Sequence, residues 1–370
     1  MMMKKWIKTI LYKISIKKCI IFESCPDVGD NPKGVFDEML RRGLNKKYKL
    51  VWLLFDNNTD YPSMENVEYV KKGTKEYGKY MRSAKCFICC NRFVYSDISQ
   101  QKSFFLTHGM YVKNPKAYYK IPKQIDYCLS SSESLKEMQA NAISAPLEKM
   151  FALGYPRNDI LTEQPLELRA YFGKYKKFIV WYPTFRQHNT GMSTGSTHAF
   201  PIIWDKENAK RINECAQRNN VLIILKPHFA QDTTKIQMLR LSNIRLIDDT
   251  FFKKNNLTSY HFVGSCDAML TDYSSIYFDY TLCDKPIGLV WEDYAEYERN
   301  PGFAFDMEYY MRGGVKIFNT EDFENFIQSV AEGTDQLKKE RREIRQLSNY
   351  STDGQSSVRV TDFIIEKANL

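Results

Sequence analysis

Two series of short apolar segments, each separated by stretches long enough to form a helix, dominate the sequence. The first series occupies residues 19–22, 50–55, 86–90, 104–106 and 127–129, and the second occupies residues 178–181, 221–225, 244–247, 268–270 and 287–290. Many of these residues are β-branched or aromatic, which favours buried strands. Strands that alternate with helices form parallel sheets covered on both faces. The pattern therefore predicts an α/β fold of two doubly wound, Rossmann-like domains.

The length of 370 residues also suits two domains, each large enough for its own core. A proline-containing loop and a charged stretch at 161–177 separate the two series. We therefore expect an N-terminal domain at 19–165 and a C-terminal domain at 166–345, with a helix at 346–370 that packs back on the N-terminal domain. Ligands of such sheets bind beyond the carboxyl ends of the strands, and a cleft between the domains is the expected site.

The first 20 residues carry six of the nine net positive charges, as six lysines without an acidic residue. Apolar residues recur among them at helical spacing, so residues 1–18 are predicted to form a basic amphipathic helix. The segment is too short and too charged to span a bilayer. It could lie on an anionic membrane surface, or it could be a solvated helix docked on its own domain.

The nine cysteines are an odd number and are scattered along the chain, which favours a reducing compartment. Cys86, Cys89 and Cys90 form a CxxC pattern that lacks a second pair or histidines at zinc spacing. We interpret this segment as a buried strand and expect no metal site.

Three strands of the second series are followed by residues that suit an anionic ligand. Arg186 follows the first of these strands, and Lys226 and His228 follow another. After a third strand come hydroxyl and acidic side chains where the next helix should begin: Thr271, Asp272, Ser274 and Ser275. Helix N-termini and arginine side chains bind phosphate oxygens, although on spacing alone plain helix capping by Asp272 or Ser274 is the simpler explanation of the third group. Together the three turns predict a phosphate-binding edge.

In the first series, His108 and Gly109 follow a strand, and His108 could act as a general base on a hydroxyl. A histidine hydrogen-bonded within a tight turn is the alternative. A basic and tyrosine-rich segment with Lys113, Lys116 and Lys120 comes next. This composition suits an acceptor that carries phosphate or lies at a membrane. Nucleic acid is not expected as a partner, because the chain outside residues 1–20 is only mildly basic and no nucleic-acid motif accompanies the segment.

Several motifs, in this order, resemble the CDP-glycerol glycerophosphotransferases of teichoic-acid and capsular-polymer synthesis. The resemblance covers nearly the whole chain, and its matching stretches are residues 22–24 with 31–32, 107–109, 153–161, 182–186, 226–228, 271–275 with 278–279, 285–286, 293 with 297, 302–303, and 353–354 with 359. The resemblance implies a GT-B fold, in which two Rossmann-like domains face each other across a cleft.

The resemblance also implies a reaction. An acceptor hydroxyl would attack the polyol-bearing phosphate of CDP-glycerol or CDP-ribitol, and CMP would leave. By position, His108 resembles the family's catalytic base and His228 the histidine that contacts the donor diphosphate. The donor-binding residues would be Arg186, Lys226, Thr271, Asp272, Ser274 and Ser275, and the acceptor or membrane side would include Gly109, Lys113, Lys116 and Lys120. No cofactor or metal is implied.

The expected acceptor is a lipid-linked or growing surface glycan, at the cytoplasmic face of a bacterial membrane. Glycerol phosphate is the expected group, and ribitol phosphate remains an alternative within the family. Two other classes also fit the residues: a GT-B glycosyltransferase that uses a nucleotide sugar, and a non-catalytic glycan-binding protein. Transfer of a polyol phosphate releases CMP, whereas sugar transfer releases a nucleoside diphosphate.

Overall fold

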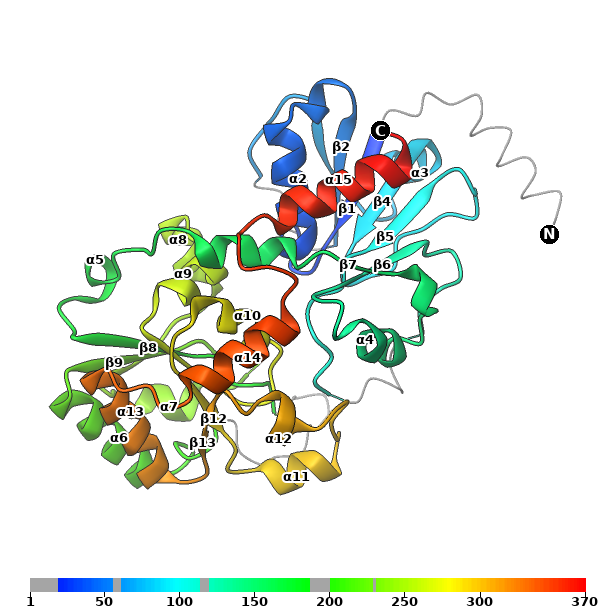
Figure 1. The fold of residues 1–370 in the computed structure, drawn as a ribbon. Helices are drawn as coiled ribbons and strands as arrows, with labels where there is room; N and C mark the ends of the chain where they lie inside the picture. Colours follow the sequence, from blue (N-terminus) through cyan, green and yellow to red (C-terminus); the bar gives the residue numbers. More distant parts are fainter. Residues whose placement is uncertain (1–18, 56–60, 114–119, 187–199, 229–230) are drawn as a thin grey trace. The chain divides into compact units, whose positions relative to one another are not determined.

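The computed structural model describes residues 19–55, 61–113, 120–186, 200–228 and 231–370 (Figure 1). The chain divides into two compact units. Unit 1 contains the described residues up to 109, together with 120–159 and 350–370, and unit 2 contains 110–113 and the described residues of 160–349. The sequence predicts domain boundaries at 165/166 and 345/346, and the chain passes between the two units at 159/160 and 349/350. The predicted helix at 1–18 lies outside the described residues.

Unit 1 is built on a seven-stranded sheet in which every pair of neighbours is parallel. The strands are β1 (Cys19–Glu23), β2 (Lys49–Leu54), β3 (Val67–Lys71), β4 (Ala84–Cys89), β5 (Lys102–Phe105), β6 (Tyr127–Ser130) and β7 (Met150–Ala152). Their spatial order is β3-β2-β1-β4-β5-β6-β7. The order reverses between β1 and β4, the point where doubly wound sheets bind ligands.

The helices of unit 1 cover this sheet. They are α2 (Asp30–Arg41), α3 (Lys75–Ser83), α4 (Lys136–Ala142) and α15 (Ser356–Ala368), with short helical turns η1 (Leu44–Lys46), η2 (Leu147–Lys149) and η3 (Pro156–Thr162), the last of which runs on into unit 2. Helix α15 joins the last part of the chain to the first, because it packs beside α2 (Figure 1). Its residues Val360, Ile364 and Ala368 belong to the same buried cluster as Phe22 and Trp52. Unit 1 therefore completes its core with the final helix of the chain.

Unit 2 repeats the same sheet topology. Its strands are β8 (Lys177–Trp181), β9 (Val221–Leu225), β10 (Ile244–Leu246), β11 (Ala268–Thr271), β12 (Ile287–Val290) and β13 (Val315–Ile317), in the spatial order β10-β9-β8-β11-β12-β13, and all neighbours are parallel. Here the order reverses between β8 and β11. The two series of apolar segments thus correspond to two parallel sheets, as the sequence predicts.

The helices of unit 2 are mostly short. They are α5 (Arg169–Phe172), α6 (Lys206–Arg218), α7 (Thr234–Met238), α8 (Asp249–Asn255), α9 (Ser259–Ser265), α10 (Ile276–Tyr280), η4 (Thr281–Cys283), α11 (Tyr294–Arg299), α12 (Met307–Tyr310), α13 (Thr320–Glu332) and α14 (Lys338–Ser348). The longer helices α6 and α13 lie side by side (Figure 1). Their apolar faces bury Ile212 and Phe323 in one core with Trp181 of β8.

The cysteines lie mostly in the cores. All nine are free thiols, and Cys86, Cys89 and Cys90 are fully buried in and just after β4. Burial raises the pKa of each of these three thiols above its ordinary value. The expectation that the CxxC segment is a buried strand is confirmed. Among the residues that the structure describes, no three His, Cys, Asp or Glu side chains are grouped so that they could hold a metal ion.

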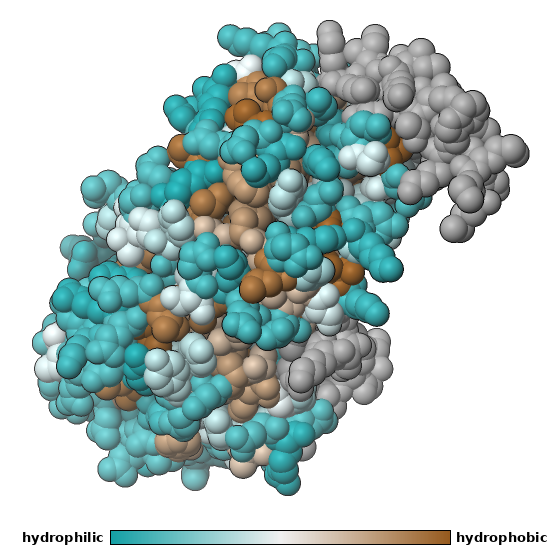
Figure 2. Space-filling view, turned by 45° about the vertical axis from the view of Figure 1, so that its right-hand side comes forward, coloured by the Kyte–Doolittle hydropathy of each residue, from teal (hydrophilic) through white to brown (hydrophobic). Residues whose placement is uncertain are grey.

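The face shown in Figure 2 is mostly hydrophilic, and its hydrophobic residues lie in small separate groups. Single exposed apolar residues are usual on a folded protein. Within the described ranges, no helix is both long and apolar enough to cross a bilayer.

Candidate active site

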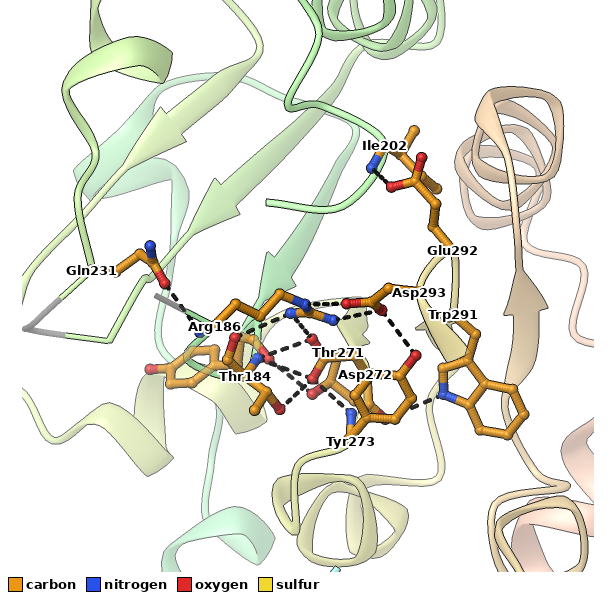
Figure 3. A network of polar contacts seen from close by, with 11 residues as sticks. Thr184, Arg186, Ile202, Gln231, Thr271, Asp272, Tyr273, Trp291, Glu292 and Asp293 are labelled. Carbon is orange, nitrogen blue, oxygen red and sulfur yellow. Dashed lines mark hydrogen bonds and ion pairs between the residues drawn. The ribbon is translucent and has the colours of Figure 1, made fainter. Parts of the chain in front are cut away.

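The turn residues of unit 2 meet at the point where its strand order reverses. Residues 182–186 follow β8, and residues 272–275 follow its neighbour β11. The carboxyl ends of parallel strands lie at one edge of a sheet, so the side chains after β8 and β11 can contact one another. Figure 3 shows that they form one continuous polar network, to which residues after β12 also contribute.

Arg186 is the centre of this network, and its side chain is fully buried. Its Nη1 donates to Asp272 Oδ2 at 2.5 Å and to the Thr184 carbonyl at 3.0 Å. Its Nε donates to Asp293 Oδ2 at 2.7 Å, and its Nη2 donates to Asp293 Oδ1 at 3.2 Å. One guanidinium therefore joins the turns that follow three strands, β8, β11 and β12.

The two carboxylates bind further groups of the same turns. Asp272 accepts the backbone N–H and the hydroxyl of Thr184, and also the backbone N–H of Tyr273 at 2.6 Å. Asp293 accepts the hydroxyl of Tyr273 at 2.9 Å. Each buried charge is thus both paired and hydrogen-bonded, which is the condition under which a buried ion pair is tolerated.

Electrostatics in the network favour the charged forms. Burial alone would raise the pKa of Asp293, but the hydrogen bonds and charge of Arg186 lower it below its ordinary value. Burial acts to lower the pKa of Arg186, and the charges of Asp272 and Asp293 outweigh it and raise that pKa. The sequence predicts that Arg186 contacts the donor phosphate. The structure instead places its guanidinium between two carboxylates and away from solvent, so Arg186 positions the turns.

The hydroxyl residues after β11 differ in exposure. The Thr271 hydroxyl donates to the Tyr182 carbonyl at 2.8 Å and its residue is fully buried, so this predicted donor-binding residue ties β11 to the chain after β8. Ser274 and Ser275 are half-buried and lie directly before α10. Asp272, which the sequence resemblance implies to orient the turn, accepts hydrogen bonds from Thr184 and from the backbone of Tyr273.

Lys226 and His228 follow β9 at the same edge of the sheet. Lys226 is ion-paired with Asp249 of α8, with 2.9 Å between Nζ and Oδ1. The ring of His228 lies against Phe185, with 5.0 Å between ring centroids, and His228 is exposed. These two residues bring positive charge and an imidazole to the edge where the Arg186 network lies.

His108 lies in unit 1, in the turn that follows β5. The turn has an unusual backbone, because Thr107 has a φ of +51° and Gly109 a φ of +124°. The latter value is readily reached only by glycine, which explains Gly109. The side chain of Asn31 donates to the carbonyls of Leu106 and Thr107 at 3.1 and 2.9 Å and fixes the turn.

The pKa of His108 is lowered from its ordinary value. Burial is the main cause, the charge of Arg157 acts in the same direction, and the charge of Asp30 and a hydrogen bond to the Cys90 backbone oppose them. A lowered pKa keeps the imidazole neutral at pH 7, which is the form that accepts a proton.

The three predicted acceptor-side lysines are found in different places. Lys113 belongs to unit 2, where its backbone forms an antiparallel bridge with Phe303 and its Nζ lies 5.8 Å from the ring centroid of Tyr297. Burial lowers the pKa of Lys113, and the charge of Asp272 opposes this shift. Lys120 is exposed in unit 1, and Lys116 lies outside the described residues. Lys113 is thus in the unit of the Arg186 network, whereas the sequence places it in the N-terminal domain.

Sequence reasoning gave no role to several residues of these turns. Asp293 completes the Arg186 network from the loop after β12, and Glu23 at the end of β1 accepts the backbone N–H of Arg92 at 3.0 Å. Asp30 and Arg157 pair beside His108. Four of the residues described here fall within stretches that resemble the family: Glu23, Asn31, Arg157 and Asp293. The resemblance could therefore have marked them as candidate site residues, but nothing in the sequence indicated which residues they contact.

The family model for "CDP-Glycerol:Poly(glycerophosphate) glycerophosphotransferase" matches residues 6–366. The chain belongs to this family. The predicted enzyme class, a CDP-polyol phosphotransferase, is therefore confirmed at the level of the family.

Two curated relatives match this chain over most of their own length. A teichoic acid poly(glycerol phosphate) polymerase of Bacillus spizizenii is 25% identical over 79% of this chain and 78% of its own. A teichoic acid glycerol-phosphate transferase of Staphylococcus aureus is 23% identical over 96% of this chain and 95% of its own. A solved structure of the wall teichoic acid polymerase TagF, 19% identical, superimposes with a TM-score of 0.75 over 99% of this chain and 94% of that one. The predicted GT-B fold class is thereby confirmed.

We expect Arg186→Met to lower the free energy of unfolding by about 3–5 kcal/mol, because it leaves two buried carboxylates without their cation. Urea denaturation at pH 7 measures the change. Arg211→Met is the control, since Arg211 is half exposed in its pair with Glu324 and should cost less than about 1 kcal/mol. Because the folded protein lowers the pKa of Asp293, the ionised form of Asp293 stabilises the wild type at pH values above the ordinary aspartate pKa near 3.8. This stabilisation is lost as the pH falls below that value, so the difference in unfolding free energy between the wild type and the variant should shrink there. A deficit at pH 7 no larger than that of the control would contradict this account.

Proposed function

We propose that the protein transfers glycerol phosphate from CDP-glycerol to a hydroxyl of a growing or lipid-linked teichoic-acid-like polymer and releases CMP. The observation that carries the proposal is the family match over residues 6–366. The described site supports it, because unit 1 presents a half-buried histidine of lowered pKa and unit 2 presents Lys226, His228 and two serine hydroxyls at one sheet edge.

In this reaction the acceptor hydroxyl attacks the phosphorus that bears glycerol. His108 accepts the hydroxyl proton, a new P–O bond forms to the acceptor, and the P–O bond to CMP breaks with its electron pair leaving on CMP. Lys226 neutralises charge that gathers on the phosphates, and His228, Ser274 and Ser275 donate hydrogen bonds to them. Phosphoryl transfer depends on such positioning and charge stabilisation more than on covalent chemistry. We further propose that the reaction needs no protein-bound metal, which retention of activity in EDTA would support.

A thermal-shift titration tests the donor assignment without knowledge of the acceptor. CDP-glycerol should raise the melting temperature at lower concentration than UDP or GDP, because a ligand that binds only the native state stabilises it by mass action. A stronger effect of CDP-ribitol would assign the other polyol of the family. Preference for UDP or GDP, with release of a nucleoside diphosphate on turnover, would favour a nucleotide-sugar transferase instead.

We expect His108→Gln to lower CMP release by about 10²–10⁴-fold while the Kd for CDP-glycerol changes little, because a general base acts on the acceptor and not on the donor. His261→Gln is the matched control, since His261 bonds the Gln164 carbonyl at 2.8 Å and has no role in the reaction. In the wild type, activity should fall with acid only below the ordinary histidine pKa of 6.5, since the pKa of His108 is lowered. Loss of CDP-glycerol affinity with unchanged turnover would reassign His108 to donor binding.

We propose that the six lysines of residues 1–18 attract the protein to anionic lipid at the cytoplasmic face of the membrane, where a lipid-linked acceptor would lie. Removal of residues 1–18 should abolish sedimentation with phosphatidylglycerol vesicles and leave CDP-glycerol binding intact. Equal sedimentation of the full chain and the shortened chain would refute this part of the proposal.

A further inference from the structure

Asp30 and Arg157 form a partly buried ion pair beside the His108 turn, and the reaction described above gives neither a role. Asp30 is the first residue of α2 and comes after the loop that follows β1. Arg157 lies in η3, after β7. The Arg157 Nη1 donates to both carboxylate oxygens of Asp30, at 3.0 and 3.1 Å. Only 9% of the Arg157 side chain and 13% of the Asp30 side chain is exposed.

The same Arg157 nitrogen also holds the histidine turn. It donates to the His108 carbonyl at 2.7 Å, while Asn31 of α2 donates to the two preceding carbonyls. The Asn31 Oδ1 in turn accepts the backbone N–H of Arg157 at 3.2 Å. Three successive carbonyls, those of residues 106–108, are thus fixed from outside the turn, and a backbone with positive φ at Thr107 needs such support.

The charges around His108 act in opposite directions. Asp30 favours the protonated imidazole, and Arg157 together with burial disfavours it. Two other titratable groups lie near this pair. Glu23 contacts the backbone of residues 90–92, and burial raises the pKa of the Cys90 thiol, which stays neutral at pH 7. Asp30 shares the Arg157 Nη1 with the His108 carbonyl and is therefore the carboxylate tied most directly to the histidine turn.

We propose that Asp30 and Arg157 are positioning residues of the transfer reaction: Arg157 fixes the backbone of the base, and Asp30 stabilises the imidazolium that forms when His108 takes the acceptor proton. This inference rests on the proposed role of His108 as the base. Asp30 and Arg157 come from two elements that are far apart in sequence, and Arg157 lies in a stretch that resembles the family.

Asp30→Asn tests the electrostatic part. Asparagine has the same size and tolerates the positive φ of +55° at this position, so the fold should be kept. We expect kcat/KM to fall about 10- to 100-fold, a part of the ~10²–10⁴-fold that a positioned base contributes. Because Asp30 raises the pKa of His108, the acid limb of the pH profile of kcat/KM should move to lower pH. The Kd for CDP-glycerol should stay within about 2-fold.

Arg157→Gln tests the other partner and should move the acid limb to higher pH, because Arg157 lowers the pKa of His108. The opposite shifts of the two variants are a signature that a general loss of stability would not produce. Asp37→Asn is the matched control on the same helix, since Asp37 is half exposed in its pair with Lys33, and it should change neither rate nor profile.

His108→Gln, measured in parallel, distinguishes a failure of the proposed base from a failure of the roles proposed for Asp30 and Arg157. If His108→Gln is inactive and Asp30→Asn retains the wild-type pH profile, Asp30 has no electrostatic role and the present inference fails while the proposed function stands. If His108→Gln keeps full turnover, the proposed base fails and the roles of Asp30 and Arg157 fail with it. If either pair variant does not fold, as judged by its melting curve, the pH shift of the other decides.

Discussion

A buried guanidinium is costly unless its charge is paired and its N–H groups are hydrogen-bonded, and this requirement shapes the carboxyl edge of the sheet in unit 2. Arg186 meets it with Asp272 and Asp293, which come from the turns after two other strands. Each of the three charges would be costly alone, because removal of one partner leaves the others buried and uncompensated. The three turns therefore stabilise one another, and the serines after β11 follow directly on one of them.

The two units share a strand order and secure their turns differently. In unit 2 a buried cation joins side-chain carboxylates. In unit 1 the same edge is held mainly through the backbone: Asn31 and Arg157 donate to the carbonyls before and at His108, and Glu23 accepts backbone N–H groups after β4. The hydrogen bonds to the backbone of its turn leave His108 half-buried, whereas the side chain of Arg186 in the ion network is fully buried. The difference suits the role of base that we propose for His108, since a base must meet its substrate, and the structural role of Arg186 in joining the three turns.

Much of this arrangement could be predicted from the sequence. Strands such as β4 and β9 are runs of buried apolar residues, and such runs are visible without a structure, as is the helical length of the segments between them. The order of short motifs indicated the family. The partners of Arg186 could not be predicted for a physical reason: a sequence shows that an arginine follows a strand, but it does not show which carboxylates lie beside it. Asp293 is 107 residues away from Arg186 along the chain, and only the folded sheet brings the two together. The unit to which Lys113 belongs was missed for the same reason, because its bridge to Phe303 is a long-range pairing without a local signal.

The place of α15 has a consequence for the order in which the protein can form during synthesis. Apart from residues 110–113, the described part of unit 2 lies between β7 and α15 in the chain, so a ribosome completes unit 2 before the last helix of unit 1 emerges. Until then the apolar surface that Val360 and Ile364 will cover, around Phe22 and Trp52, stays exposed on the nascent chain. Unit 2 can reach its native state first, while unit 1, although it begins earlier, must wait for the final segment. A frameshift or early stop after residue 349 would therefore damage the unit that was translated first.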